Sequence, residues 1–303
     1  QYVLGLRAAE DLPEEVTPLD VGSARHEILA RFFQASSGQA LADSDIDACL
    51  VRLHEISRAV LSKVDISRTE LPEEAWAVEQ EAIENELRLV ISEEVEHSRA
   101  TKGMWAPAYL EWDFGTDGVQ ALEINPDGPL VRGRIDRIDR GPGGVLAVYD
   151  YKSASTPDPG DIESLAVLQI PLYILAAQEI LCREGGQVVG GCYYSIANRK
   201  VESGVWLKDY AASLRAGAKR KGKYTCEGLC EFLESVKSEA VRITQSVRSG
   251  RFRIAPRKCN PQRCRFAGVC GYDPAVAGAK QAGAEPRGAG GPRSVRHGGD
   301  AVD

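Results

Sequence analysis

Apolar and polar positions repeat with two different periods along the chain, and the first hundred residues follow the helical one. Residues 19–34 repeat apolar side chains near the 3.6-residue period of an amphipathic helix. These side chains are Ala24, Ile28, Leu29, Phe32 and Phe33. Two further helices are predicted over residues 44–64 and 71–100, and Pro72 suits the first turn of the last one. This last helix is strongly acidic and is expected to lie on the surface.

A period of two follows, which is typical of half-buried β-strands. The strands predicted here cover residues 108–114, 119–125, 130–139 and 145–152. GPGG at 141–144 indicates a tight turn. The last two strands are therefore expected to form a hairpin.

Both periods occur in the second half of the chain. A helix is predicted from Asp161, as its N-cap, to about residue 182, with Pro171 kinking or restarting it. The elements expected after it are strands over 187–196 and 201–208, helices over 209–218 and 227–249, and an extended segment over 251–254. After residue 273 the composition is too poor in large apolar side chains to offset the ordering entropy. Residues 274–303 are therefore predicted to be disordered.

Length and composition fit a globular protein of one large or two small domains. The chain has 303 residues, 43% of them hydrophobic and 27% charged. It has no apolar run of about 18 residues that would predict a membrane span. Its first residues have no basic segment followed by an apolar one, so no signal peptide is predicted. The first residue is Gln1 and not Met, so we expect the chain to begin inside a domain.

The charge is unevenly distributed. The net charge is −7, but residues 1–150 carry 14 basic and 29 acidic side chains, a difference of −15, whereas residues 151–303 carry 23 and 15, a difference of +8. Such charge runs are often only solvated faces. A basic half is nevertheless typical of proteins that bind a phosphate-bearing partner.

The stretch 133–173 carries the candidate chemistry. Asp136 and Asp150 lie on the two strands of the predicted hairpin, and Lys152 shares a face with Asp150 because strand residues two apart point the same way. Two close carboxylates repel unless a cation neutralises them, and oxygen ligands suit Mg²⁺ or Mn²⁺. These residues therefore predict a metal-dependent phosphodiesterase centre, with ordinary hairpin salt bridges as the alternative. Gln169 and Tyr173 follow at helical spacing, on one face.

Four segments in this order resemble the PD-(D/E)XK nuclease superfamily. They are GSARH at 22–26, GRIDRID at 133–139, DYK at 150–152 and QIPLY at 169–173. The segments resemble the RecB/AddB type of nuclease domain found in bacterial helicase–nucleases, with VLGL at 3–6 as a further point of likeness.

The resemblance implies a fold and a set of roles. The fold is an α/β restriction-endonuclease-like core, a central mixed β-sheet flanked by helices, with a helical insertion near the N-terminus. The nuclease domain would cover residues 1–273, the insertion 35–100 and a cysteine cluster 259–270. The residues and roles implied are His26, Asp136, Asp150 and the Tyr151 carbonyl as ligands of the divalent cation, Lys152 as the catalytic lysine, Gln169 and Tyr173 as residues that line the nucleic-acid strand or brace the lysine, and Glu111 as an acidic residue that supports the site. His54 and His97 match no position of the pattern.

Three of the eight cysteines crowd together near the end of the chain. Cys259, Cys264 and Cys270 have the spacing C-x4-C-x5-C, and thiolates this close can hold a metal centre. The resemblance implies a 4Fe–4S cluster whose fourth cysteine lies upstream of Gln1; zinc and no metal remain alternatives. The first gap is longer than the C-x2-C typical of that family. Cys226 and Cys230 are four residues apart on a predicted helix. They could substitute as ligands, but a buried face of the helix is the favoured interpretation.

The function implied by the resemblance is that of a divalent-cation-dependent DNA exonuclease. It would act in the cytoplasm, at the nucleoid, with a helicase or partner nuclease subunit in double-strand break repair. The chain has no G-x-x-x-x-G-K-[ST] motif, so its motor would lie elsewhere. A stand-alone nuclease similar to those of CRISPR adaptation, or a catalytically silent DNA-end-binding module, are alternatives.

Residues 1–303 expressed alone should show a labile or missing iron–sulfur cluster, because the fourth thiolate is expected upstream of Gln1. The absorption spectrum and the iron content of the purified chain check this. A stable iron–sulfur spectrum from this chain alone would contradict it.

Overall fold

The computed structural model describes residues 18–36, 38–66, 72–116, 118–126, 128–182, 186–215 and 222–251. The chain divides into two compact units, residues 1–245 and 246–303. The first unit contains the sheet and the helices that pack on it. In the second, the described residues 246–251 hold the end of the last helix and a turn.

A mixed six-stranded sheet forms the centre of the first unit, in the order β1-β4-β5-β6-β7-β8. Its strands are β1 (Ala106–Phe114), β4 (Gly133–Arg140), β5 (Leu146–Lys152), β6 (Val188–Ser195), β7 (Lys200–Leu207) and β8 (Lys223–Tyr224). The pairs β1–β4, β4–β5 and β6–β7 are antiparallel, whereas β5–β6 and β7–β8 are parallel. The predicted mixed sheet and the predicted hairpin are therefore confirmed.

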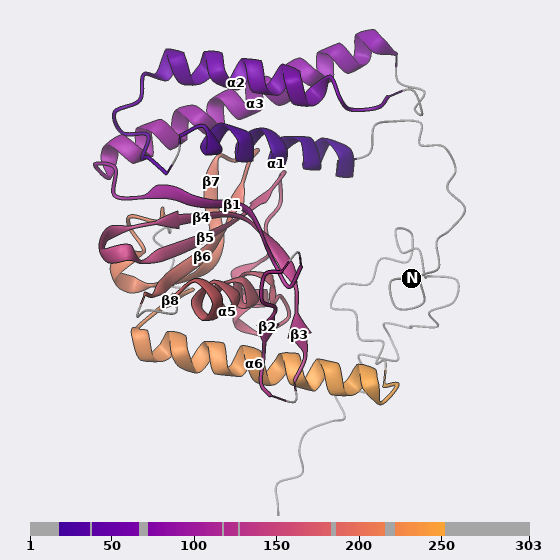
Figure 1. The fold of residues 1–303 in the computed structure, drawn as a ribbon, viewed down its shortest axis with the longest axis vertical. Helices are drawn as coiled ribbons and strands as arrows, with labels where there is room; N and C mark the ends of the chain where they lie inside the picture. Colours follow the sequence, from indigo (N-terminus) through magenta and orange to yellow (C-terminus); the bar gives the residue numbers. More distant parts are fainter. Residues whose placement is uncertain are drawn as a thin grey trace, which may run out of the picture. The chain divides into compact units, whose positions relative to one another are not determined.

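Helices cover both faces of this sheet (Figure 1). On one side lie α1 (Pro18–Gln34), α2 (Ile46–Leu61) and α3 (Glu73–Ala100), and on the other lies α5 (Gln169–Leu181). A short helix α4 (Pro159–Glu163) precedes α5, and α6 (Cys226–Arg248) follows β8. The Lys237 ammonium of α6 lies 3.5 Å from the Glu179 carboxylate of α5. Two 3₁₀ turns occupy Pro142–Gly144 and Lys208–Tyr210.

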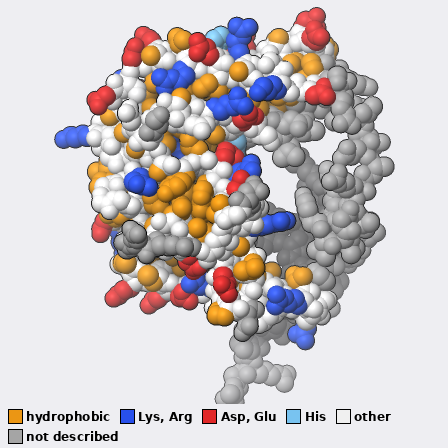
Figure 2. All heavy atoms as spheres, in the orientation of Figure 1, with side chains coloured by type: hydrophobic (Ala, Val, Ile, Leu, Met, Phe, Trp, Pro, Cys, Tyr) orange, Lys and Arg blue, Asp and Glu red, His pale blue; other side chains and the backbone are white. Residues whose placement is uncertain are grey.

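The helices of the described ranges do not include one with both the length and the apolar character needed to cross a membrane. Figure 2 shows basic and acidic side chains interspersed over the helices at the top and bottom of one face, with hydrophobic side chains gathered between them.

Several predicted boundaries are wrong. The strand expected over 130–139 is interrupted at Arg132: β3 (Leu130–Val131) pairs with β2 (Leu122–Glu123), which is all that remains of the strand expected over 119–125, and β4 starts at Gly133. The helix expected over 209–218 is a 3₁₀ turn followed by turns up to residue 215. The extended segment predicted over 251–254 and the tail after 273 lie outside the described residues, apart from residue 251.

The helix expected from Asp161 to about residue 182 is two helices. Asp158, not Asp161, caps the first, because its carboxylate accepts a hydrogen bond from the Gly160 N–H at 2.7 Å. Pro171 is the third residue of α5, in the first turn, where a missing N–H removes no helical hydrogen bond. The alternative that Pro171 restarts the helix is therefore the correct one.

A buried ion network joins α3 to the sheet. In β4, successive side chains point to opposite faces, so Arg137 turns toward α3 while Asp136 does not. The Arg137 guanidinium donates two hydrogen bonds to Asp139, at 2.6 and 2.7 Å, and one to Glu94 at 2.8 Å. It also stacks over the Phe33 ring of α1, 4.1 Å from the centroid. The surface position expected for α3 is therefore wrong for Glu94, which is only 7% exposed.

Charge in this network fixes the ionisation of Glu94. Burial by itself would raise the pKa of the Glu94 carboxyl, but the charges of Arg215 and Arg137 outweigh burial and lower the pKa from 4.5 to about 2. Arg215 lies 2.8 Å from Glu94. Glu94 therefore stays ionised across the neutral and mildly acidic range.

Glu94→Gln should destabilise the fold by about 3–5 kcal/mol at pH 7, because it removes the carboxylate that pairs with Arg215 and one of the two that pair with the buried Arg137. Urea denaturation of the variant and the parent measures this difference. Glu84→Gln is the matched control on the same helix: Glu84 pairs with the half-exposed Arg88 and His54, and its loss should cost less than about 1 kcal/mol.

The difference between the parent and Glu94→Gln should depend on pH with a defined sign. The folded-state pKa of Glu94 lies below its ordinary value, so its stabilisation is complete above about pH 4.5 and is lost as the pH falls toward 2. Denaturation at pH 7, 5, 4 and 3 should show the difference shrinking over the last steps. A difference that is constant down to pH 3 would contradict this assignment.

Candidate active site

The site begins where β4 and β5 separate. Their pairing ends with Arg137 opposite Tyr149, and Asp136 and Asp150 are the next residues of the two strands. The Tyr151 backbone N–H, beyond the last paired residue, donates to Asp136 Oδ2 at 2.6 Å. A side-chain carboxylate thus takes up a backbone donor that the sheet leaves without a strand partner. Both carboxylates are held at the sheet by regular strand geometry and not by a loop.

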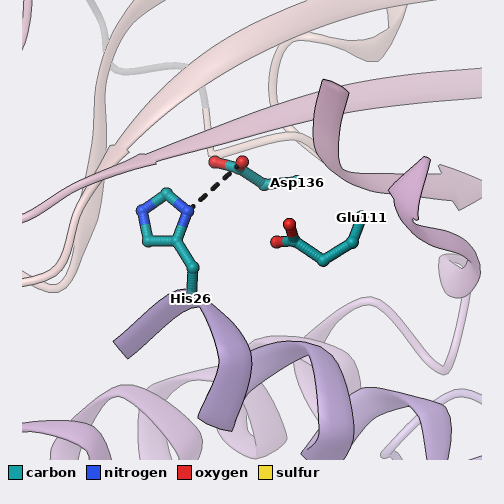
Figure 3. Close-up of side chains that lie close together, drawn as sticks. All are labelled: His26, Glu111 and Asp136. Carbon is teal, nitrogen blue, oxygen red and sulfur yellow. Dashed lines mark ion pairs between the residues drawn. The ribbon is translucent and has the colours of Figure 1, made fainter. Parts of the chain in front are cut away.

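Three side chains from three elements converge on one point (Figure 3). His26 comes from α1, Glu111 from β1 and Asp136 from β4. The His26 Nδ1 lies 3.3 Å from Asp136 Oδ1, and one donor atom of each of the three residues lies within 4.8 Å of the others. This spacing is compatible with a single cation bound by one nitrogen and two carboxylate oxygens.

The backbone at Glu111 is strained. Its φ is +45° in the middle of β1, a left-handed conformation that residues other than glycine rarely adopt. Its neighbours stay in register, Leu110 with Arg137 and Trp112 with Ile135, so Glu111 lies opposite Asp136. The irregular conformation sits where the Glu111 carboxylate faces the Asp136 carboxylate, and strain of this kind is concentrated at functional sites.

A second set of contacts runs along β5 into α5. The Lys152 ammonium lies 2.6 Å from Asp150 Oδ2 and donates to Gln169 Oε1 at 3.2 Å. The Gln169 amide donates to Asp150 Oδ1 at 2.8 Å and to the Tyr173 hydroxyl at 3.2 Å. Lys152 also lies over the Tyr193 ring, 5.4 Å from its centroid. Asp150, Lys152 and Gln169 therefore form one hydrogen-bonded group.

Gly133, the first residue of the GRIDRID segment, makes room for Tyr173. A Cβ atom at this position would lie 3.0 Å from the Phe114 ring and 3.3 Å from the Tyr173 ring. These two rings meet edge to face, with centroids 6.1 Å apart. The glycine thus allows α5 to approach β4 closely enough for Tyr173 to reach the site.

The electrostatics of the site favour a bound cation. Burial and the charge of Asp136 raise the pKa of Asp150 to about 6, and the same two causes raise the pKa of Glu111. Burial would lower the pKa of His26, but the hydrogen bond and charge of Asp136, together with the charges of Glu111 and Asp150, raise it. The charged forms of Asp150 and Glu111 are thus destabilised by Asp136, and a divalent cation would relieve that repulsion.

The donor set suits the predicted cation. Carboxylate oxygens with a single imidazole are ligands that Mn²⁺ and Mg²⁺ accept, whereas thiolates would favour softer metals. Asp150 was expected among the ligands, but its side chain engages Lys152 and Gln169, and Glu111 takes the place beside His26 and Asp136. The ligand role of Asp150 and that of the Tyr151 carbonyl stay predictions.

Of the other candidates, the structure describes Cys226, Cys230, His54 and His97. Cys259, Cys264 and Cys270 are outside the described residues. Cys226 and Cys230 are exposed, so the buried face expected for them is wrong. His54 is exposed beside Glu84, and His97 hydrogen-bonds the Ser213 carbonyl at 3.0 Å.

Sequence reasoning missed the groove that opens from this site. A cavity of about 700 Å³ runs between α1 and β1 and includes His26, Glu111, Arg31 and Arg134 in its lining. The residues of α1 that line it are Ser23, His26, Glu27, Ala30, Arg31, Phe33 and Gln34. Apart from Phe33, their spacing of three and four residues could have indicated a common face.

Comparison with known proteins agrees with this geometry. Among curated proteins, none matches the chain. The family model described as the PD-(D/E)XK nuclease superfamily matches residues 1–271, which include the described residues of the site and the whole sheet. The mixed sheet with helices on both faces, on which Asp136, Asp150 and Lys152 lie, is the restriction-endonuclease-like fold. The chain therefore belongs to the PD-(D/E)XK nuclease superfamily.

Proposed function

We propose that the chain is a divalent-cation-dependent DNA exonuclease domain of the RecB/AddB type, and that it forms part of a helicase–nuclease that acts in double-strand break repair. Membership of the superfamily supports a nuclease that acts on DNA and uses divalent metals. The observation that carries the proposal is the convergence of His26, Glu111 and Asp136 beside the Asp150–Lys152 pair. The RecB/AddB subtype rests on the order of the sequence motifs.

In this proposal, His26, Glu111 and Asp136 hold the cation, and Asp150 and the Tyr151 carbonyl complete its oxygen ligands. A divalent cation bound there supplies positive charge that polarises the phosphodiester and lowers the pKa of water. The hydrogen bond from the Tyr151 N–H fixes one Asp136 oxygen, at 2.6 Å. The other Asp136 oxygen, Oδ1, faces His26, so this carboxylate can bind a cation without losing its support from the backbone.

Lys152 is the proposed catalytic lysine. Phosphodiester hydrolysis forms a bond between a water oxygen and phosphorus and breaks the bond to the leaving sugar oxygen, while negative charge grows on the phosphate oxygens. An ammonium held in place stabilises that charge or orients the water. Asp150 and Gln169 hold the Lys152 ammonium at 2.6 and 3.2 Å, and Tyr173 in turn supports Gln169.

Two alternatives are kept as outcomes of the experiments. A stand-alone nuclease similar to those of CRISPR adaptation would share the same site but work without a helicase. A DNA-end-binding module would bind DNA without cutting it. The intact group Asp136, Asp150 and Lys152 favours an active enzyme.

The proposed 4Fe–4S cluster on Cys259, Cys264 and Cys270 has its support in the sequence alone. Its role would be structural, since four thiolates that join distant parts of a chain restrict the unfolded state. Absorption spectroscopy of the purified chain, as given above, tests it independently of nuclease activity.

Asp150→Ala and Lys152→Ala should each lower the rate of cleavage of linear DNA in Mg²⁺ by about a hundredfold or more, because each removes a charge positioned for the transition state. Labelled linear and circular DNA, followed on gels, measure this loss. Lys200→Ala is the matched control, since Lys200 pairs with Glu202 on β7 and should keep parental activity.

The outcomes separate the hypotheses. Cutting of linear DNA alone would support an exonuclease. Activity that survives both substitutions would contradict the assigned site. Binding without cutting in the parent would favour the DNA-end-binding module.

His26→Ala should weaken Mn²⁺ binding by about tenfold or more, because it removes a proposed ligand and even residues that only support a ligand change the affinity by about ten- to a hundredfold. Titration calorimetry with Mn²⁺ and no DNA measures this, and the Mn²⁺ concentration for half-maximal cleavage should rise in parallel. His54→Ala is the matched control, because His54 also contacts a carboxylate, at 2.9 Å from Glu84. Equal Mn²⁺ affinity in His26→Ala and the parent would exclude His26 as a ligand.

A further inference from the structure

The groove between α1 and β1 opens directly from the proposed metal site. His26 and Glu111 belong both to the site and to the lining of this cavity of about 700 Å³. Any chain bound in the groove can therefore continue into the site without crossing another element. A substrate bound in the groove can therefore place its reacting group beside His26 and Glu111.

Polar and apolar side chains line both walls of the groove. One wall is the face of α1, with Ser23, Glu27, Arg31, Phe33 and Gln34, and the other is the stretch of β1 and its approach with Pro107, Ala108, Leu110 and Glu111. Between them, Ala30 and Gly38 add little bulk. Charged groups beside apolar ones suit a ligand that carries both kinds of group, as a nucleic-acid strand does.

The dimensions fit a short stretch of one strand. From Ser23 to Gln34 the helix rises by about 17 Å, at 1.5 Å per residue. Cavities of about 300–1,000 Å³ hold ligands of drug size, and a single nucleotide fits at the lower end of this range, at roughly 300 Å³. The groove of about 700 Å³ therefore has room for about two nucleotides.

Arg31 is the cation in this groove best placed to exchange partners. Its side chain is 40% exposed and pairs with Glu27 one turn away on the same helix. Such exposed pairs contribute little in water, so a phosphate can compete for the guanidinium. Arg134, by contrast, is fixed by two hydrogen bonds of 2.9 Å to Asp113 and lies 3.7 Å from Glu111.

We infer that this groove binds about two nucleotides of a single DNA strand adjoining the scissile phosphate, with Arg31 contacting a phosphate and Glu27 restraining that contact. The inference rests on the proposed nuclease function and adds the path of the strand to it. Glu27 and Arg31 act in opposite directions, because one repels the backbone phosphates and the other attracts them.

The test uses the full chain and a 5′-fluorescein-labelled oligo-dT of 20 nucleotides, with EDTA to prevent cleavage. Fluorescence anisotropy gives the Kd at several salt concentrations. Arg31→Ala should raise the Kd about three- to tenfold and reduce the slope of log K against log salt by about 0.7, the value of one phosphate contact on a single strand. Arg31→Lys should retain the slope, and Glu27→Gln should tighten binding about threefold.

The matched controls are Arg88→Ala and Glu84→Gln on α3. Arg88 is also 40% exposed and pairs with a glutamate four residues before it, but it does not line the groove. Both variants should bind within about twofold of the parent. In Mg²⁺, Arg31→Ala should raise the KM for the labelled strand and leave kcat unchanged, which a general loss of structure would not do.

Different results would contradict the proposed strand path and the proposed nuclease function. If the parent cuts DNA but Arg31→Ala and Glu27→Gln bind the strand as Arg88→Ala does, the path through the groove is wrong and the nuclease function stands. If the parent neither binds nor cuts the strand, both are wrong. If Arg31→Ala loses affinity equally for the strand and for a blunt 20-base-pair hairpin without a free single strand, the groove is not a single-strand path.

Discussion

The hydrogen bond from the Tyr151 N–H to Asp136 is the contact on which the site depends. It forms where β4 and β5 stop pairing, so one strand end supplies a backbone donor and the other a carboxylate. It fixes Asp136, and through Asp136 the positions that His26 and Glu111 can share. The same divergence leaves Asp150 and Lys152 facing α5, where Gln169 meets them. If β4 and β5 stayed paired beyond Arg137 and Tyr149, the Tyr151 N–H would bond to the backbone of β4 and would not hold the Asp136 carboxylate.

Tyr151, near the end of β5, makes contacts on both faces of the sheet. While the Tyr151 backbone holds Asp136 in the site, the Tyr151 hydroxyl accepts a hydrogen bond from Arg137 at 3.2 Å on the face toward α3. Arg137 is next to Asp136 in β4, and successive side chains of a strand point to opposite faces. Asp136 therefore lies in the proposed metal site, while Arg137 contacts α3. The strain at Glu111 and the repulsion between the carboxylates are local costs, and the ion pairs and strand pairing around the site offset them. The site is thus less stable than its surroundings, and a bound cation would remove the part of this instability that comes from repulsion between carboxylates.

The sequence predicts the parts of the site that are local in the chain. Asp136, Asp150 and Lys152 follow from strand spacing and a hairpin turn, and Gln169 with Tyr173 from helical spacing. His26 and Glu111 come from far upstream, and only the resemblance to a family pointed to them. The network of Glu94, Arg137 and Arg215 was missed. A glutamate on an acidic helix is expected at the surface, and its arginine partners lie far away in the sequence. The break at Arg132 and the turns after Tyr210 were missed because local periodicity does not report which strand a segment can pair with.

The position of Glu94 has a consequence for how the molecule opens. Arg137 of β4 and Arg215, after β7, both pair with this one carboxylate of α3. If α3 moved away from the sheet, both ion pairs would break, and Arg137 would keep only Asp139 as its counter-charge. Local opening of the helical layer alone is therefore expensive, and α3 should exchange its amide hydrogens together with the central strands in one cooperative unit. A segment that looks like an accessory insertion in the sequence is thereby bound into the same folding unit as the strands that carry Asp136 and Asp150.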